Sequence, residues 1–338
     1  MTLMLREASE AANVVQAQID RNADTVRRIG RKLRDLGPQL IVTCARGSSD
    51  HAATYAKYLL ENRSGVFVAS AAPSIHSVYR TSMHFARSAC LVISQSGASP
   101  DILAVARAAK KGGAYVVAIV NRTDSPLAGL AHDVIDIRAG AEVSVAATKS
   151  FIASLTSVMQ LTACWVDDAS LHDAIRSAPA KLAEAWSSDW SAATDRIASS
   201  RNLYVLGRGI GLGVAQEAAL KLKEVCGLHA EAFSAAEVLH GPIAIAGESF
   251  PVLVLAQRDE TFDGVAGLVA DLARRGIALI TAGIHNPGAI NLPGPDADPS
   301  LEPLLRIQSF YRLAAGLAQE LGLDPDKPPF LQKVTATI

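Results

Sequence analysis

The chain has 338 residues, of which 49% are hydrophobic and 19% are charged, and its formal net charge is −1. That length exceeds one ordinary domain and predicts two lobes, and the composition is that of a globular protein with a well-filled core. A net charge so near zero excludes an overall field that would draw the chain to nucleic acid or to an anionic membrane. We therefore expect neither as a partner.

The sequence carries no signal for a membrane or for export. No apolar run reaches the roughly 18 residues of a transmembrane helix, and the N-terminus lacks the basic-then-apolar pattern of a signal peptide. The four cysteines, Cys44, Cys90, Cys164 and Cys226, are far apart, lie in apolar surroundings and share no metal-type spacing. We expect buried thiols rather than disulfides, no metal, no cofactor and a cytoplasmic location.

Helical and strand patterns alternate along the chain. Apolar residues recur at a helical period over residues 3–36, and Gly37-Pro38 ends that helix. We expect strands at 40–44, 66–70, 91–95, 114–120 and 134–137, and helices at about 48–61, 73–80, 99–111 and 148–166. This alternation predicts an α/β fold in which helices cover both faces of a parallel sheet.

The strand pattern then repeats. The runs that begin at Leu40, Leu91 and Ala114 are matched by similar runs that begin at Leu203, Val252 and Ile277. Each match lies about 162 residues further on, so the chain is two copies of one doubly wound, flavodoxin-like α/β unit. We expect an N-terminal helical segment at 1–37, a first domain at 38–167, a helical connector at 168–198, a second domain at 199–322 and a C-terminal tail at 323–338.

Two loops rich in hydroxyl groups follow predicted strands of the first copy. One, ARGSSD at 45–50, contains Ser49, and the other, SQSGASPD at 94–101, contains Gly97 and Ser99. Ligands of parallel sheets bind beyond the carboxyl ends of the strands, where free N–H groups at helix starts favour a phosphate. Ser49 and Ser99 could instead be simple N-caps. Two such loops at one end of one sheet favour the phosphate site.

The glycine-rich run 207–213 also follows a strand, but its spacing fails the dinucleotide fingerprint and no Walker lysine is present. The next helix places Glu217, Lys221 and Glu224 on one face. That row could be a solvated salt-bridge ladder. At the binding end of the sheet, however, a lysine between two carboxylates could have its titration tuned for proton transfer. His240 then closes a short helix, where a lone histidine is more often structural.

Several separated motifs resemble one known family, the isomerase half of glucosamine-6-phosphate synthase, which is a tandem pair of SIS (sugar isomerase) domains. The similarity covers nearly the whole chain and lies in SQSG at 94–97, GAEVSVAATKSF at 140–151, LGRG at 206–209, EAALKLKE at 217–224, HAEAFSAAEVLHGP at 229–242 and LQKVT at 331–335. Among members of that family, a stand-alone glucosamine-6-phosphate deaminase is the most similar kind.

The resemblance implies roles for individual residues. Glu224 matches the base that moves a proton between C1 and C2 of the open-chain sugar, and Lys221 matches a lysine near the reacting oxygens. His240 matches the ring-opening histidine, which reaches the site from a neighbouring subunit, so a homodimer with shared sites is implied. Lys333 matches a tail lysine that can form an imine. The implied substrate-binding residues are Ser49, Ser94, Gln95, Ser96, Gly97, Ser99, Ala146 and Glu217.

Two positions depart from the family pattern: Arg46 replaces a cysteine, and Ala147 replaces a serine. The synthase also carries an N-terminal glutaminase that begins with a nucleophilic cysteine, whereas position 2 is threonine here. We therefore expect the reverse chemistry, in which glucosamine 6-phosphate becomes fructose 6-phosphate and ammonia. The alternatives are a ketosamine-phosphate deglycase, another hexose-phosphate aldose-ketose isomerase of the same superfamily, and a non-catalytic phosphosugar sensor.

Overall fold

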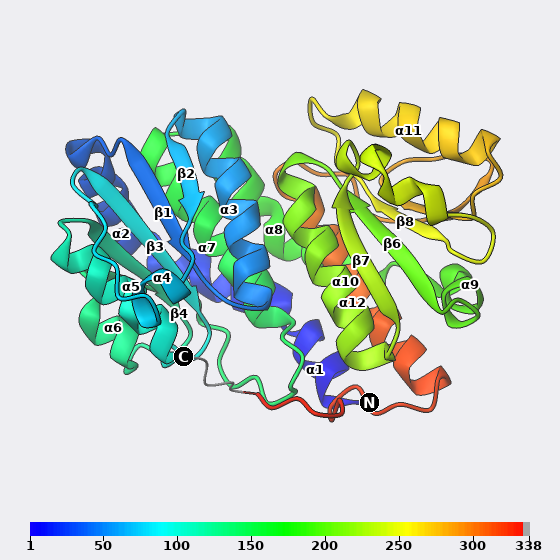
Figure 1. Cartoon of the computed structure of the whole chain (residues 1–338), viewed down its shortest axis with the longest axis horizontal. Coiled ribbons are helices and arrows are strands. Elements are labelled where there is room, and N and C mark those ends of the chain that lie inside the picture. Colours follow the sequence, from blue (N-terminus) through cyan, green and yellow to red (C-terminus); the bar gives the residue numbers. More distant parts are fainter. Residues whose placement is uncertain (334–338) are drawn as a thin grey trace. The chain divides into compact units, whose positions relative to one another are not determined.

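A computed structural model describes residues 1–333 and divides into two compact units, each with its own parallel sheet (Figure 1). The first unit contains Asn13–Glu142 and Lys149–Arg176, together with Gln332 and Lys333. The second unit contains Met1–Ala12, Val143–Thr148 and Ser177–Leu331. Because both units draw on separated stretches of chain, the domain boundaries expected from the sequence stay a prediction.

The first sheet has five parallel strands in the order β2-β1-β3-β4-β5. Its strands are β1 (Leu40–Cys44), β2 (Phe67–Ser70), β3 (Ser88–Ser94), β4 (Tyr115–Val120) and β5 (Asp133–Asp136). The central strand β3 is buried at every residue. Its continuous run of apolar side chains is typical of a strand covered on both faces.

The second sheet repeats this arrangement. Its strands are β6 (Asn202–Gly207), β7 (His229–Ser234), β8 (Val252–Leu255), β9 (Leu279–Ala282) and β10 (Ala289–Leu292). Their order is β10-β9-β8-β6-β7, and all neighbours are parallel. Read from the other edge, it is the order of the first sheet. The predicted fold class, two tandem flavodoxin-like units, is therefore confirmed.

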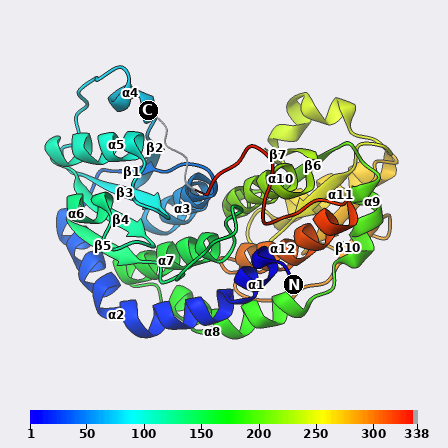
Figure 2. The same ribbon diagram turned by 90° about the horizontal axis from the view of Figure 1, so that it is seen from below.

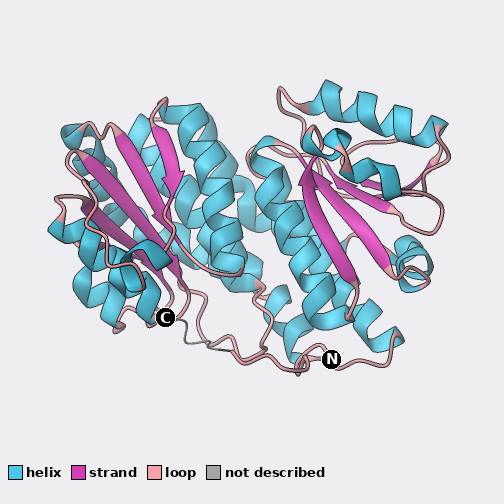
Figure 3. Ribbon diagram, viewed as in Figure 1, coloured by secondary structure: helices cyan, strands magenta, loops and turns pink. Residues whose placement is uncertain are grey.

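Helices cover both faces of each sheet (Figures 2 and 3). The helices built mainly from the first unit are α2 (Ala11–Leu36), α3 (Ser48–Ser64), α4 (Ser74–Ser77), α5 (Pro100–Lys111), α6 (Pro126–Leu130) and α7 (Lys149–Val166). Those of the second unit are α1 (Leu3–Ser9), α9 (Thr194–Ala198), α10 (Leu212–Cys226), α11 (Phe262–Arg274) and α12 (Glu302–Glu320). Helix α8 (Ala169–Ser187) has residues in both units. In the second unit α10 packs against α12.

Three expectations from the sequence need correction. The helix expected over 3–36 is interrupted at Glu10, which caps α1 with helical dihedral angles, so the apolar period continues across the break. The helix expected over 73–80 is reduced to Ser74–Ser77, because Val78 and Tyr79 are 56% and 71% exposed and have no face to bury. Three cysteines are buried as predicted, but Cys164 is only partly buried.

None of the helices within residues 1–333 combines the length and the apolar character that crossing a bilayer requires.

Candidate active site

The loop after β3 turns tightly at Gly97. Its φ is +61°, and its backbone N–H donates to the hydroxyl of Ser94 at 3.0 Å. A Cβ placed on Gly97 would lie 2.7 Å from the Cβ of Ser125 and closer still to its hydroxyl. Ser125 cannot easily move, because its side chain caps α6 by accepting from Ala128 N. Glycine is therefore required at this position for both conformation and space.

Neither predicted serine serves as a helix cap through its side chain. Ser99 occupies the N-cap position of α5, but its side chain makes no capping bond. Ser49 lies inside α3, whose N-cap is Gly47. The N-cap interpretation is therefore wrong for Ser49. Ser99 does occupy the N-cap position, but its side chain does not cap the helix. The starts of both helices follow neighbouring strands of the first sheet, so the two hydroxyl-rich loops lie along the carboxyl end of that sheet, as expected.

Helix α10 carries a buried row of charges. Lys221 is 1% exposed, and its Nζ lies 3.3 Å from Glu217 Oε1 and forms a close ion pair with Glu224 Oε2. Glu217 is fully buried and accepts a hydrogen bond of 3.3 Å from the hydroxyl of Tyr311 on α12. Glu224 keeps 19% of its side chain exposed. The solvated-ladder alternative is therefore excluded, because the row runs from the core to a single exposed carboxylate.

Lys221 is a permanent cation in this setting. Burial alone would lower the pKa of its ammonium, but the charges of Glu217 and Glu224 and the hydrogen bonds to them outweigh burial and raise the pKa above its usual value. A lysine that stays charged cannot serve as a base near neutral pH. It can hold two carboxylates in place and stabilise negative charge that develops nearby.

Glu224, at the exposed end of this row, borders a cavity of about 650 Å³ in the second unit. Glu224 lines it together with Lys223 and Lys327, and the remaining walls come from the end of α10 and from the tail after α12. A partly exposed carboxylate beside a cavity of this size is placed to exchange a proton with a small bound molecule.

His240 ends a short 3₁₀ turn, Glu237–His240, and is exposed. The next 3₁₀ turn, Pro242–Ile245, accepts a hydrogen bond of 2.9 Å from the hydroxyl of Tyr204 at the carbonyl of Pro242. Within residues 1–333, His240 is not among the residues that line the Glu224 cavity. The structure thus presents His240 on the surface of the second unit and does not join it to Glu224.

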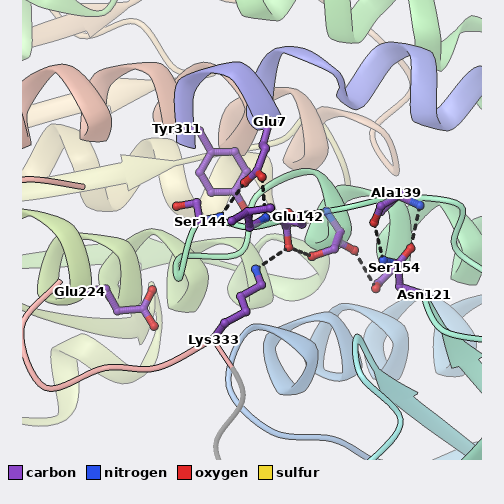
Figure 4. A network of polar contacts seen from close by, with 12 residues as sticks. Glu7, Asn121, Ala139, Glu142, Ser144, Ser154, Glu224, Tyr311 and Lys333 are labelled. Carbon is purple, nitrogen blue, oxygen red and sulfur yellow. Dashed lines mark hydrogen bonds and ion pairs between the residues drawn. The ribbon is translucent and has the colours of Figure 1, made fainter. Parts of the chain in front are cut away.

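Lys333 is held by a carboxylate that the sequence reasoning did not single out. Its Nζ lies 3.0 Å from Oε2 of Glu142, whose side chain has no exposed surface (Figure 4). The same carboxylate accepts from the backbone N–H and the hydroxyl of Ser150 at 3.1 and 2.5 Å. Glu142 is therefore the residue that anchors the predicted tail lysine. Its position inside the GAEVSVAATKSF motif was the available signal.

The segment Val143–Thr148, which contains the fully buried Ala146, belongs to the second unit and is bound there by α1. Glu7 on α1 accepts from the backbone N–H groups of Val143 and Ser144 at 2.5 and 3.2 Å (Figure 4). Asp326 of the tail accepts in turn from the first N–H groups of α1 at 2.7 Å each. Helix α1 therefore joins the tail to the segment that carries Ala146.

The structure thus sorts the predicted residues into groups. Ser49 and the loop 94–99 lie at the end of the first sheet, and Lys333 belongs to the same unit. Glu217, Lys221 and Glu224 form one row in the second unit, which also contains Ala146 and His240. Among residues 1–333, no cluster of three or more His, Cys, Asp or Glu side chains is placed to hold a metal ion.

Both sheets coincide with a known domain family. Residues 38–163 and 196–286 match the model of the SIS domain. The chain belongs to the SIS-domain family. The first match covers the whole first sheet and the second covers β6 to β9 of the second sheet, in agreement with the duplication seen in the strand order.

Individual SIS proteins are also similar to this chain. The glutamine–fructose-6-phosphate aminotransferase (isomerizing) of Aquifex aeolicus is 29% identical over 350 residues, which cover 99% of this chain and 57% of that protein. The chain therefore spans little more than half the length of this curated relative. A crystal structure of a candidate phosphosugar isomerase from Silicibacter pomeroyi DSS-3 shares 42% identity and has a TM-score of 0.93, covering 96% of this chain and 100% of the other.

A glucosamine-6-phosphate deaminase from Thermotoga maritima has the same architecture, with a TM-score of 0.82 and coverage of 99% of this chain and 100% of the other. Its identity is 20%, so this likeness concerns the fold alone.

Proposed function

We propose that this SIS protein is a phosphosugar isomerase that releases an amine, converting glucosamine 6-phosphate and water into fructose 6-phosphate and ammonia. The observation that carries the proposal is the α10 row, in which the buried cation Lys221 holds one partly exposed carboxylate, Glu224, at the edge of a cavity. The similarity to a candidate phosphosugar isomerase and to isomerizing aminotransferases supports the class of substrate.

In this proposal the loops of the first unit hold the phosphate. The N-terminus of α5 supplies a favourable dipole, and the hydroxyls of Ser96 and Ser99 supply hydrogen-bond donors. Binding energy from a phosphate that does not react can be used to position the reacting carbons.

Glu224 performs the proton transfer. It removes the proton bonded to C2 of the open-chain aldehyde and returns it to C1, so that the C2 amine becomes an imine. Water then adds to C2, ammonia leaves, and the ketose phosphate remains. Lys221 stabilises the negative charge that develops on the sugar oxygens during the transfer, because its ammonium stays protonated.

Lys333 takes part only after it loses a proton. An amine must be neutral to form an imine with a ketose, and the ammonium of Lys333 is paired with Glu142 at 3.0 Å. Glu142 is the carboxylate placed to accept this proton, because its Oε2 is the oxygen paired with Nζ.

A panel of phosphosugars tests the proposal. Purified protein is incubated with glucosamine 6-phosphate, galactosamine 6-phosphate and a fructosyl-amino-acid 6-phosphate, and ammonia, amino acid and ketose phosphate are measured. We expect ammonia and fructose 6-phosphate in equal amounts from the first substrate. Release of an amino acid instead would identify a deglycase, and no turnover of any member would reject an enzymatic function.

The Glu224→Gln variant tests the assigned base. It keeps the size of the side chain and removes the proton acceptor, so we expect kcat to fall by a factor of about 10² to 10⁴ with little change in fructose 6-phosphate binding. Glu248→Gln is the matched control, because Glu248 is 75% exposed and pairs with Arg196 at the surface. A Glu224→Gln protein with normal kcat would show that another group is the base.

A further inference from the structure

An arginine lies beside the two hydroxyl-rich loops of the first unit. Arg46 follows β1 directly and precedes Gly47, the N-cap of α3, whose φ is +54°. Its side chain is 50% exposed, and its Nε lies 2.9 Å from Oδ2 of Asp101, a carboxylate with no exposed surface. The exposed arginine is therefore attached to a fixed, buried acid.

The position of Asp101 determines where the arginine lies. Asp101 is the second residue of α5, and Ser99, the N-cap of that helix, ends the loop that begins at Ser94. The pair therefore joins the loop after β1 to the helix that follows β3. These are the two segments assigned above to the phosphate group.

The chemistry of the pair suits an anion. Asp101 accepts from Nε, which leaves the two terminal amino groups of the guanidinium fork for other acceptors. A fork held in one orientation by a buried carboxylate loses little further freedom when it binds a phosphate with two parallel hydrogen bonds. An arginine that served only to neutralise Asp101 would have no need to keep half of its side chain in solvent.

The charges of the two loops also favour the binding of an anion at Arg46. Over residues 45–50 and 94–101, Arg46 is the only cationic side chain, whereas Asp50 and Asp101 are both acids. Burial raises the pKa of Asp50, and the neighbouring charges of His51 and Arg46 offset part of that effect. Without Arg46 the loops would present two carboxylates and no side-chain cation to a phosphate dianion.

We propose that Arg46, oriented by Asp101, binds the phosphate group of the substrate and is a determinant of specificity for phosphorylated sugars. This inference rests on the proposed function, because it places the phosphate at the same loops. Arg46 stands where the synthase family has a cysteine, so the contact adds a charge that a thiol could not supply.

Binding measurements test the proposal independently of turnover. The dissociation constants of fructose 6-phosphate and of inorganic phosphate are measured by calorimetry for the wild type and for Arg46→Gln. We expect binding of both ligands to weaken by about 10- to 100-fold, the effect of losing hydrogen bonds to a charged group. We expect kcat/KM to fall at least as far, because the phosphate contact also positions the reacting carbons.

Three further variants separate binding from folding. Arg46→Lys keeps the charge but not the fork and should recover part of the affinity. Asp101→Asn should weaken phosphate binding by a smaller factor, because the guanidinium loses its orienting partner. Arg27→Gln is the matched control, since it removes one exposed arginine of α2 that pairs with Asp24, and it should bind both ligands normally. Thermal melting of each variant shows whether it is folded.

The outcomes distinguish this inference from the proposed function. If folded Arg46→Gln binds fructose 6-phosphate as tightly as the wild type, the role of Arg46 is overturned. A wild type that binds the ligand but turns over no aminosugar phosphate rejects the function while still testing Arg46. A wild type that binds neither ligand overturns both.

Discussion

At the scale of single residues, Lys221 decides what the α10 row can do. Its ammonium is buried between Glu217 and Glu224, and its raised pKa keeps it charged throughout the physiological range. A group whose pKa is higher in the folded protein contributes stability that is complete below its unfolded pKa. That contribution is lost only when the pH rises through the folded pKa. Lys221 should therefore contribute no pH dependence to the stability of the wild type between pH 5 and 9.

Replacement of Lys221 by Met should create such a dependence. Glu217, which has no exposed surface, would lose its cation, and we expect the free energy of unfolding to fall by about 3–5 kcal/mol at neutral pH. The buried carboxylate would then bind a proton that the unfolded chain releases. The stability of the variant should therefore decrease as the pH rises from about 5 to 8. Urea unfolding of the variant at several pH values measures this change in the free energy of unfolding.

The double variant Glu217→Gln/Lys221→Met is the control for that experiment. It removes the buried acid, so the pH dependence should disappear and part of the stability should return. If the stability of Lys221→Met is equal at pH 5 and pH 8, Glu217 does not depend on Lys221 for its charge.

Single residues of the candidate site differ in how far the sequence could predict their surroundings. Gly97 and the α10 row follow from spacing within a few residues, and the structure places them as expected. The pairs Lys333–Glu142 and Tyr311–Glu217 join residues 191 and 94 positions apart. No local pattern encodes such contacts, since they depend on how whole elements pack. Glu142 could be noticed in its motif, but its partner could not.

At the scale of elements, the strands are the most predictable part of the chain. Short apolar β-branched runs predicted the five strands of the first sheet and β6, β8 and β9 of the second, because a strand buried on both faces has few other compositions available. The strands β7 and β10 were not predicted, since most of their residues are not buried. Helix ends were less predictable. The apolar period continues across Glu10, so nothing in the period separates α1 from α2. That break matters, because it lets α1 join the second unit while α2 covers the first.

Helix α1 anchors the tail through Asp326, which accepts from the N–H groups of Leu3 and Met4 at 2.7 Å each. Asp326→Ala leaves those groups without their acceptor and removes a negative charge at a helix N-terminus, a loss of about 1–2 kcal/mol. We expect faster proteolysis within residues 322–331 and a lower kcat/KM. For Asp326→Asn, the proteolysis rate and kcat/KM should lie between the values of the wild type and of Asp326→Ala.

The control for the tail anchor is Asp124→Ala, because Asp124 is an exposed acid that pairs with the exposed Arg122. If Asp326→Ala and Asp124→Ala are cleaved at the same rate as the wild type, α1 does not hold the tail.

At the scale of the whole molecule, one fold occurs twice and the copies have diverged. In the first copy the loop after β3 is a tight turn built on Gly97. Its counterpart after β8 contains Gln257, which is 2% exposed and donates to the carbonyl of Arg208 at 2.8 Å. The buried side-chain amide of Gln257 therefore fills this part of the sheet edge and pairs with a backbone group there. The repeated strand order thus supports the loop that we propose binds phosphate in one copy and the charged row of α10 in the other.

The exposed position of His240 leads to a prediction about assembly. The family resemblance implies that this histidine serves the site of a neighbouring subunit, and His240 lies on the surface of the second unit. If sites are shared in a C2 dimer, a Glu224→Gln chain and a His240→Ala chain can together form one intact site. Each variant alone should be inactive.

Mixing the two inactive variants tests this directly. After equal amounts exchange subunits at random, half of the dimers are mixed, and each mixed dimer holds one intact and one doubly defective site. Activity should therefore return to about a quarter of the wild-type value. Exchange is verified by native mass spectrometry of chains that differ in mass. If mixed dimers form and remain inactive, Glu224 and His240 serve the same chain, and the exposed surface around His240 needs another explanation.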